Sequence, residues 1–275
     1  MQTTTLAGKT VPRMGFGTMR LTGSAVRGAP RDRDEAVRVL QTVADLGIKV
    51  IDTAWYYGPD IPSQLLAETL SPYPEDMLIV TKLGAEWNRL GRIVAAHTPE
   101  KLREGMMRDL RLLKLDQVPI VHLRWTDDPN VDDNFKTALA AMITMQQEGL
   151  LQHIGLSNIS LEQLDYALMQ TPIATVSNLY NFADRRDDAM VDRTAELRIA
   201  YLPWLPLGVG RTDASPVLRN WAENLGVTTS QVALAWLLQR APNIIPIPGT
   251  SSVAHLTENF AAGELMLPPT AMAAI

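Results

Sequence analysis

Hydrophobic and polar positions follow two alternating patterns along the chain. Short apolar runs bounded by turn residues are typical of strands buried on both faces, and longer stretches with an apolar residue at about every third or fourth position are typical of helices packed on a core. The run 49–52, which ends in Asp52, is a clear example of the first pattern. Residues 98–113 are an example of the second pattern. Thr98 followed by Pro99 also favours a helix start at this point.

The two patterns alternate over the whole chain and give eight strand–helix pairs. A short hairpin over 3–14, centred on Gly8, precedes them, and the longest irregular stretches, 21–32 and 83–97, are interpreted as loops over the functional site. The predicted strands are 14–18, 49–52, 77–82, 117–122, 152–156, 174–178, 200–204 and 243–247. The helices of these pairs are predicted at 33–46, 62–70, 101–113, 132–148, 160–169, 187–197, 216–225 and 252–261, and a further helix, 229–239, precedes the last strand.

This alternation, in a chain of 275 residues, predicts an α/β protein, a (β/α)8 TIM barrel with a short N-terminal β-hairpin. Right-handed crossovers would make all the barrel strands parallel. Since α/β barrels of this size are commonly one domain, and no long linker interrupts the pattern, residues 1–275 are expected to form a single domain.

Composition narrows the classes of function. A net charge of -5 argues against binding to nucleic acid, which requires a basic surface. The absence of cysteine excludes disulfides, thiolate zinc sites and cysteine nucleophiles. The four histidines lack the spacing of metal ligands, so no metal site is expected. Neither a signal peptide nor an apolar run of membrane-spanning length is present, so we expect a cytoplasmic protein without membrane contact.

Polar or aromatic side chains recur at the ends of the predicted strands. In barrels of this type the chemistry lies at the carboxyl ends of the strands. Each residue alone has an ordinary structural interpretation, such as a helix cap, a solvated lysine or a core histidine, but their recurrence at equivalent positions indicates a site. These residues are Asp52, Lys82, His122, Ser157 with Asn158, Asn178 and Trp204.

Motifs in a fixed order resemble those of the aldo-keto reductase family over nearly the whole chain. Within that family, residues 203–207 and 234–259 are similar to bacterial members described as pyridoxine 4-dehydrogenases or pyridoxal reductases. The matching segments are 15–18, 52–58, 80–82, 121–122, 154–158, 206–208, 247–250 and 258–259.

The resemblance implies a catalytic tetrad of Asp52, Tyr57, Lys82 and His122. Hydride reduction of a carbonyl leaves an alkoxide that needs a proton. A free phenol, with a pKa of about 10, is a weak acid, and a lysine ammonium nearby would lower that pKa. Tyr57 is therefore the expected proton donor, with Lys82 lowering its pKa, Asp52 anchoring Lys82 and His122 orienting the carbonyl. Tyr56 is the other candidate for the role of proton donor.

The implied cofactor is a nicotinamide dinucleotide bound without a Rossmann motif. The family's phosphate-binding Lys and Arg correspond here to Gly249 and His255, which supply less charge than an arginine fork would. NADP(H) is still favoured over NAD(H), because the hydroxyls of residues 250–252 can donate hydrogen bonds to a phosphate and His255 can add partial charge. Phosphates are expected at the glycine-rich loops after strands seven and eight. The expected cofactor-binding residues are Gly17, Thr18, Met19, Asp52, Ser157, Asn158, Asn178, Trp204, Pro206, Leu207, Gly208, Gly210, Arg211, Gly249, Thr250, Ser251, His255, Glu258 and Asn259.

The function predicted from this resemblance is reduction of an aldehyde or ketone to an alcohol, or the reverse, by direct hydride transfer. Two alternatives stay open: a lyase that forms a Schiff base on Lys82, since a lysine at a strand end can do so, and a nicotinamide-binding regulatory subunit with little turnover. The partner is a small carbonyl compound or alcohol, and the surrounding side chains suit a hydrophobic or aromatic one. The expected substrate-contacting residues are Tyr57, Trp55, Trp87, His122 and Trp125.

Overall fold

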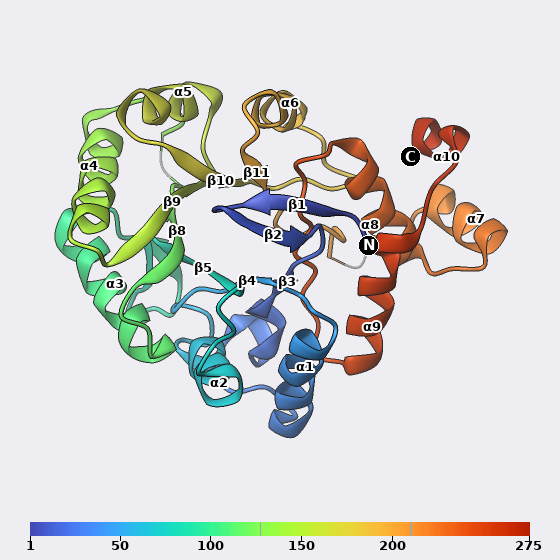
Figure 1. The fold of residues 1–275 in the computed structure, drawn as a ribbon, viewed down its shortest axis with the longest axis horizontal. Coiled ribbons are helices and arrows are strands. Elements are labelled where there is room, and N and C mark those ends of the chain that lie inside the picture. Colours follow the sequence, from blue (N-terminus) through green and yellow to red (C-terminus); the bar gives the residue numbers. More distant parts are fainter. Residues whose placement is uncertain (127, 210) are drawn as a thin grey trace.

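A curled parallel sheet surrounded by helices forms the body of the protein (Figure 1). The computed structural model describes residues 1–126, 128–209 and 211–275. Hydrogen bonds join seven parallel strands in the order β11-β10-β9-β8-β5-β4-β3. These strands are β3 (Phe16–Gly17), β4 (Val50–Asp52), β5 (Leu78–Leu83), β8 (Val118–Arg124), β9 (Leu151–Ser157), β10 (Ile173–Ser177) and β11 (Ala200–Tyr201).

An extended segment, 243–248, closes the sheet into a barrel. Ile245 N donates to Tyr201 O at 2.9 Å on one side, and Gly15 N donates to Pro246 O at 2.9 Å on the other. The segment corresponds to the predicted strand 243–247, but it forms only an isolated parallel bridge between Tyr201 and Ile244. Its prolines lack N–H groups and cannot donate to a regular ladder. The predicted (β/α)8 barrel is thus confirmed, with an irregular eighth strand.

The predicted N-terminal hairpin is also confirmed, as β1 (Thr3–Leu6) paired with β2 (Lys9–Pro12). Figure 1 shows it lying across the centre of the barrel. Leu6 and Val11 of the hairpin belong to the same buried cluster as residues from the barrel interior, including Leu78. The hairpin therefore fills one end of the barrel with apolar side chains, which leaves the opposite end for the pocket.

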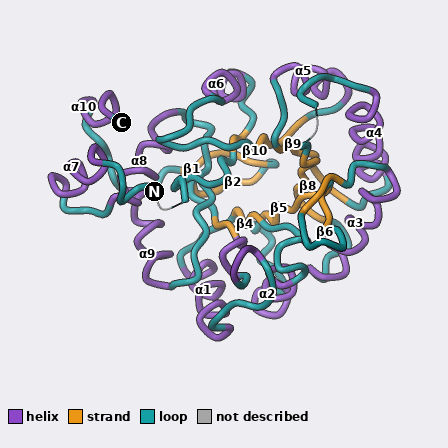
Figure 2. Tube along the Cα trace, turned by 180° about the vertical axis from the view of Figure 1, so that it is seen from behind, coloured by secondary structure: helices purple, strands orange, loops and turns teal. Residues whose placement is uncertain are grey.

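Helices form an outer ring around the strands (Figure 2). Their starts follow the expected capping rules: Thr98 Oγ1 accepts from Lys101 N at the start of α3, and Ser160 and Gln163 form a capping box at α5. A large apolar cluster lies between this ring and the outward face of the strands. The helices are α1 (Arg33–Asp45), α2 (Ile61–Leu70), α3 (Pro99–Leu113), α4 (Asp133–Gln147), α5 (Leu161–Gln170), α6 (Asp188–Glu196), α7 (Pro216–Leu225), α8 (Thr229–Arg240), α9 (Val253–Ala261) and α10 (Pro269–Ala274), with 3-10 turns at η1 (Thr18–Leu21), η2 (Ser24–Val26) and η3 (Ala262–Glu264).

Several short elements were not predicted. The stretch 83–97 holds an antiparallel pair, β6 (Ala85–Trp87) and β7 (Ile93–Ala95), the stretch 21–32 holds η2, and α10 follows the last predicted helix. Each is too short to show a clear periodic pattern. Among the described residues, none of the helices combines the length and apolar character needed to cross a bilayer.

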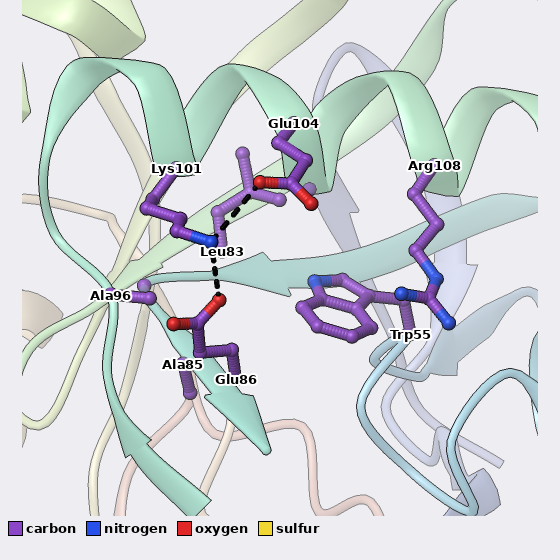
Figure 3. A pocket seen from close by; sticks show the side chains of 10 residues that line it. Trp55, Leu83, Ala85, Glu86, Ala96, Lys101, Glu104 and Arg108 are labelled. Carbon is purple, nitrogen blue, oxygen red and sulfur yellow. Dashed lines mark hydrogen bonds and ion pairs between the residues drawn. The ribbon is translucent and has the colours of Figure 1, made fainter. Parts of the chain in front are cut away.

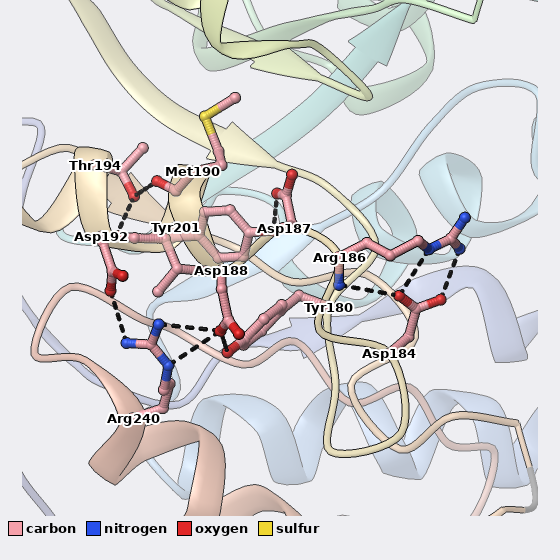
Figure 4. A network of polar contacts seen from close by, with 11 residues as sticks. Tyr180, Asp184, Arg186, Asp187, Asp188, Met190, Asp192, Thr194, Tyr201 and Arg240 are labelled. Carbon is pink, nitrogen blue, oxygen red and sulfur yellow. Dashed lines mark hydrogen bonds and ion pairs between the residues drawn. The ribbon is translucent and has the colours of Figure 1, made fainter.

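A polar network fastens α6 to the barrel (Figure 4). The Tyr180 and Tyr201 hydroxyls donate to Asp188 and Asp187 respectively, and Arg240 pairs with Asp188. Because the two tyrosines are fully buried, these contacts satisfy groups that would otherwise be costly to bury. The network holds the segment that follows β10 in place beside the pocket.

Candidate active site

A cavity of about 500 Å³ opens at the carboxyl ends of the strands. This end of the barrel is where the predicted polar side chains were expected to meet. The cavity is lined by Gly17, Met19, Arg20, Val26, Asp52, Tyr56, Tyr57, Lys82, Ile93, Arg124, Ser157, Asn158, Trp204, Leu205, Pro206, Leu207, Val209, Thr212, Ser230, Ile247, Pro248 and Gly249.

Lys82 and Asp52 form a buried ion pair at the floor of the cavity. Lys82 Nζ lies 2.5 Å from Oδ1 and 2.6 Å from Oδ2 of Asp52, and it also donates to Thr53 O at 3.0 Å. The two side chains project inward from adjacent strands, β5 and β4. Burial raises the pKa of Asp52, while the ammonium of Lys82 opposes that rise. All three ammonium hydrogens of Lys82 have a partner, so the ammonium is held in one position.

Tyr57 is partly exposed in the cavity wall beside this pair. Lys82 Nζ lies 5.3 Å from the centroid of its ring. Burial, and then the negative charge of Asp52, raise the pKa of Tyr57, whereas Arg124 lowers it. The net shift is opposite to the lowering predicted from the sequence. A raised pKa keeps the phenol protonated at neutral pH, which is the state that a proton donor needs.

Tyr56, the rival donor, also lines the cavity but is buried. Its hydroxyl forms no hydrogen bond within the described part of the chain. Its ring meets that of Tyr57 edge to face, with centroids 5.3 Å apart. The two phenols therefore differ in access to the cavity, and Tyr57 is the more accessible one.

His122 does not line the cavity, in contrast to its predicted role. Its ring is fully buried in the barrel interior, where Nε2 lies 2.6 Å from Thr175 Oγ1. Gly155 makes room for it, because a Cβ at that position would lie 2.2 Å from His122 Cδ2. Burial, and then the charge of Lys82, hold the pKa of His122 well below its usual value, so the ring is neutral.

Arg124 occupies the position at the cavity that was expected for His122. It lies two residues further along β8, on the same face of the strand, and is the register partner of Ser157 on β9. Its guanidinium lies 5.8 Å from the centroid of the Tyr56 ring. The fourth polar group at this rim is therefore a permanent cation rather than an imidazole.

Asn158 and Trp204 stand together in the cavity wall. Trp204 Nε1 donates to Asn158 Oδ1 at 2.8 Å, and Ser157 precedes Asn158 at the end of β9. Asn178 was also predicted to contact the cofactor, but its side chain bonds to the backbone instead. Its amide donates to Ile159 O at 2.8 Å and accepts from Ile159 N at 3.1 Å. Both ends of that amide are used within the protein, so Asn178 fixes the loop after β9 and does not face the cavity.

The other predicted cofactor residues divide into two groups. The first group lines the cavity and includes residues at the end of β3 and in the loop after β11. Gly210 lies outside the described residues. The predicted residues at the cavity are Gly17, Met19, Asp52, Ser157, Asn158, Trp204, Pro206, Leu207 and Gly249. The predicted residues that do not line it are Thr18, Asn178, Gly208, Arg211, Thr250, Ser251, His255, Glu258 and Asn259.

Several residues of this second group have other contacts. Thr18 Oγ1 donates to Thr53 Oγ1 at 2.9 Å. Glu258 accepts from the hydroxyl of Thr228 at 2.7 Å, which ties α9 to the start of α8. Ser251 lines a second groove, which shares Met19, Arg20 and Val26 with the cavity. These contacts place them in the wall behind the cavity or beyond its edge.

Arg20 lies at the junction of the cavity and the adjoining groove and lines both. It is exposed, and a Cβ built on Gly249 would lie 3.5 Å from Arg20 Cγ. No ion pair to its guanidinium is formed by the residues that the structure describes. Arg20 therefore supplies a cation that was not among the predicted cofactor-binding residues.

The three tryptophans predicted at the substrate do not line the cavity. Trp55 faces a separate cavity of about 10 Å³ and packs beside Arg108, with the guanidinium 4.5 Å from the ring centroid (Figure 3). Trp125 is buried and stacks on His97. Trp87 donates from Nε1 to Tyr56 O at 2.6 Å, so it supports the cavity wall from behind.

The whole arrangement can be compared with known proteins. A family model described as "Aldo/keto reductase family" matches residues 13–275. The chain belongs to the aldo/keto reductase family. The pyridoxine 4-dehydrogenase of Escherichia coli is 45% identical to this aldo/keto reductase over 268 residues, which are 96% of this chain and 94% of that protein. An uncharacterised oxidoreductase of Schizosaccharomyces pombe is 35% identical over 264 residues, or 94% of this chain and 83% of that protein.

Solved structures share the fold of this aldo/keto reductase. A thermostable aldo-keto reductase in complex with the inhibitor epalrestat has 28% identity and a TM-score of 0.83, over 99% of this chain and 98% of that one. An aldo-keto reductase of Klebsiella pneumoniae in complex with NADPH has 23% identity and a TM-score of 0.80, over 99% and 94% of the two chains. The family resemblance drawn from the sequence is thereby confirmed.

Proposed function

We propose that this aldo/keto reductase interconverts an aldehyde or ketone and the corresponding alcohol, with NADP(H) as its cofactor. The observation that carries the proposal is the ion pair of Lys82 and Asp52 beside Tyr57 at the cavity floor. A reduced nicotinamide, when bound, supplies the hydride. Ser157 and Asn158 offer hydroxyl and amide groups for its carboxamide, and Trp204 offers an indole face for its ring.

Tyr57 donates the proton in the proposed reaction. The alkoxide that forms at the substrate is a stronger base than a phenolate, so the proton moves from Tyr57 Oη to the substrate oxygen as charge develops there. The fixed charge of Lys82 stabilises the phenolate that Tyr57 becomes. Asp52 keeps Lys82 charged and in place. In the reverse direction, the phenolate accepts the proton of the alcohol.

Two observations support NADP(H) over NAD(H). The exposed guanidinium of Arg20 beside Gly249 offers a charge-assisted contact to a phosphate, which replaces the lysine and arginine expected from the family. The Klebsiella pneumoniae neighbour with the same fold was solved with NADPH. We propose that the phosphates lie along Arg20, Pro248 and Gly249.

The proposed substrate is an aromatic carbonyl compound of the pyridoxal type, because the Escherichia coli relative is a pyridoxine 4-dehydrogenase. A Schiff-base lyase is not favoured. Its amine would have to be neutral, whereas Lys82 donates to both oxygens of Asp52 and to Thr53 O and has no lone pair free to attack a carbonyl.

Loss of NADPH absorbance with pyridoxal as substrate tests the proposal. Tyr57→Phe should lower kcat by at least about a hundredfold, since a general acid contributes that much, and should leave NADPH binding intact. Tyr56→Phe is the matched control, because it removes a hydroxyl that has no partner among the described residues. Equal turnover by Tyr57→Phe and the wild type would contradict the assignment.

A further inference from the structure

Arg124 is a cation at the cavity for which the described residues supply no counter-ion. It lines the cavity and is partly buried, and among the described residues no side chain forms an ion pair or hydrogen bond with its guanidinium. Lys82, the neighbouring cation, is neutralised by Asp52. A partly buried charge is usually paired, because removal from water is costly. An unpaired guanidinium at a cavity is therefore available to an anion that enters it.

The barrel geometry separates Arg124 from the proposed phosphate site. The sheet order runs β11-β10-β9-β8-β5-β4-β3, and segment 243–248 closes the ring between β11 and β3. β8, which ends in Arg124, is thus on the side of the barrel opposite the closing segment that leads to Gly249. If the cofactor phosphates lie along Gly249, they are too far from Arg124 to neutralise its charge. The anion at Arg124 must come from the other reactant.

Arg124 also lies close to the proposed proton donor. Its guanidinium is next to the Tyr56 ring, which in turn meets the ring of Tyr57. The charge of Arg124 lowers the pKa of Tyr57, which is consistent with this proximity. An anionic oxygen bound to Arg124 would therefore be close to the carbonyl oxygen that Tyr57 protonates.

We propose that Arg124 selects carbonyl substrates that carry an anionic oxygen close to the reacting carbonyl, such as a phenolate ortho to an aldehyde or a carboxylate next to a ketone. The planar guanidinium suits such an oxygen, since it donates two parallel hydrogen bonds. The anionic oxygen is unchanged in the reaction: the carbonyl carbon takes the hydride and the carbonyl oxygen takes the proton of Tyr57. This inference rests on the proposed carbonyl reduction.

Matched charged and neutral substrates test it. The carboxylate pair is phenylglyoxylate and its methyl ester. The phenolate pair is 2-hydroxybenzaldehyde and 2-methoxybenzaldehyde, compared at a pH above the pKa of the 2-hydroxybenzaldehyde hydroxyl so that this member is ionised. NADPH is the cofactor for both pairs. The wild type should favour the charged member of at least one pair by about tenfold or more in kcat/KM. The pair that shows the preference identifies the anionic group, and the preference should fall as salt concentration rises.

Variants of Arg124 then decide the assignment. Arg124→Gln should bring the charged-to-neutral ratio close to one, and Arg124→Lys should leave an intermediate ratio because the charge stays and the planar fork is lost. Arg89→Gln, which removes an exposed guanidinium from the β6–β7 turn, is the matched control and should keep the wild-type ratio. Unchanged NADPH binding confirms that each variant is folded.

The inference and the proposed function can fail separately. If the neutral substrates are reduced but the wild type shows no preference in either pair, or the preference survives Arg124→Gln, Arg124 has no such role and carbonyl reduction stands. If no carbonyl compound is reduced, the proposed function is wrong. Benzoate and benzamide binding, followed by tryptophan fluorescence, then decides on Arg124: a roughly tenfold weaker affinity of Arg124→Gln for benzoate alone supports the anion site, and equal affinity overturns it.

Discussion

Lys82 Nζ lies 2.5 Å and 2.6 Å from the two carboxylate oxygens of Asp52, and both residues are almost completely buried. Asp52→Asn should lower kcat by about a hundredfold, because it leaves the charge that stabilises the Tyr57 phenolate unanchored. It should also lower the free energy of unfolding by about 3 kcal/mol, since a buried charge loses its partner. Steady-state kinetics and urea unfolding measure the two effects.

The pair of Lys49 and Asp76, which lies at the surface before β4 and β5, gives the control for this prediction. Asp76→Asn should change the free energy of unfolding by less than about 1 kcal/mol, because solvent screens an exposed pair, and should not change kcat. Equal effects of Asp52→Asn and Asp76→Asn on both quantities would contradict the proposed role of the buried pair.

Two charges of opposite sign flank the proposed phosphate site. Arg20 lies beside Gly249, and Glu35 accepts a hydrogen bond from Val253 N at the start of α9 at 3.0 Å. Arg20→Gln should weaken NADP⁺ binding about tenfold, since a charge-assisted contact to phosphate is lost. Glu35→Gln should strengthen it, because a carboxylate no longer repels the phosphate or occupies the helix N-terminus.

Titration of each variant with NADP⁺ and NAD⁺, followed by tryptophan fluorescence, measures these changes. NAD⁺ is the internal control because it lacks the 2′-phosphate. If both variants change the two Kd values by the same factor, Arg20 and Glu35 do not discriminate between the cofactors, and the 2′-phosphate lies elsewhere.

Asp109 is a buried carboxyl group behind the site. Thr81 Oγ1 donates to its Oδ2 at 2.8 Å, and its Oδ1 has no partner among the described residues. Burial raises the pKa of Asp109 to about 8. Between pH 4 and pH 8 the folded protein therefore keeps a proton that the unfolded chain has lost. The contribution of Asp109 to the free energy of unfolding therefore falls as pH rises through this window, by up to about 1.4 kcal/mol per pH unit.

Asp109→Asn keeps an acceptor for Thr81 and cannot ionise, so it should flatten this pH dependence. Urea unfolding at pH 5, 6, 7 and 8 checks the slope. Asp133→Asn, at a side chain that is 98% exposed, is the control and should keep the wild-type slope. A wild-type slope in Asp109→Asn would show that Asp109 is ionised in the folded protein throughout this range.

His122 is predicted to support the barrel interior rather than the reaction. His122→Gln replaces the imidazole with an amide that can still bond to Thr175, and it should retain most turnover. Removal of a proton-transferring group would instead lower kcat by about a hundredfold. The variant is expected to be less stable, because the ring packs against Gly155. A loss of kcat as large as that of Tyr57→Phe would restore the catalytic assignment of His122.

We also propose that residues 1–275 are one folding unit. The six tryptophans are spread from Trp55 to Trp236, so their fluorescence reports on most of the chain. Thermal unfolding followed by fluorescence and by far-UV circular dichroism should give coincident single transitions. Two separated transitions would indicate two domains.

The barrel was predictable because its strand–helix alternation is repeated many times, so an error in one element does not change the architecture. The site was less predictable because it depends on where each strand ends. The apolar run before His122 suggested an end there, whereas β8 continues to Arg124. Since both residues point to the same face, a shift of two positions exchanged an imidazole for a guanidinium at the cavity.

Asn178 shows a different limit of sequence-based prediction. The sequence placed it as the last residue of the sixth strand, and it directly follows β10, which ends at Ser177. Its amide bonds to the backbone of Ile159 in both directions. A sequence gives the donors and acceptors that a side chain carries but not which partner it will find. The small residue Gly155 gave no signal either, although it makes space for the His122 ring.

The proline-rich closing segment joins the barrel without the regular ladder that links the other strands. Where β8 and β9 meet, a regular ladder runs along seven-residue strands, but at 243–248 the ring is joined by scattered hydrogen bonds. This irregularly bonded segment ends at Pro248 and is followed by Gly249, and the phosphates are proposed to bind at these two residues. A dinucleotide bound across this segment would link its two sides. The stretch of chain that binds the cofactor would therefore also gain the most rigidity from it.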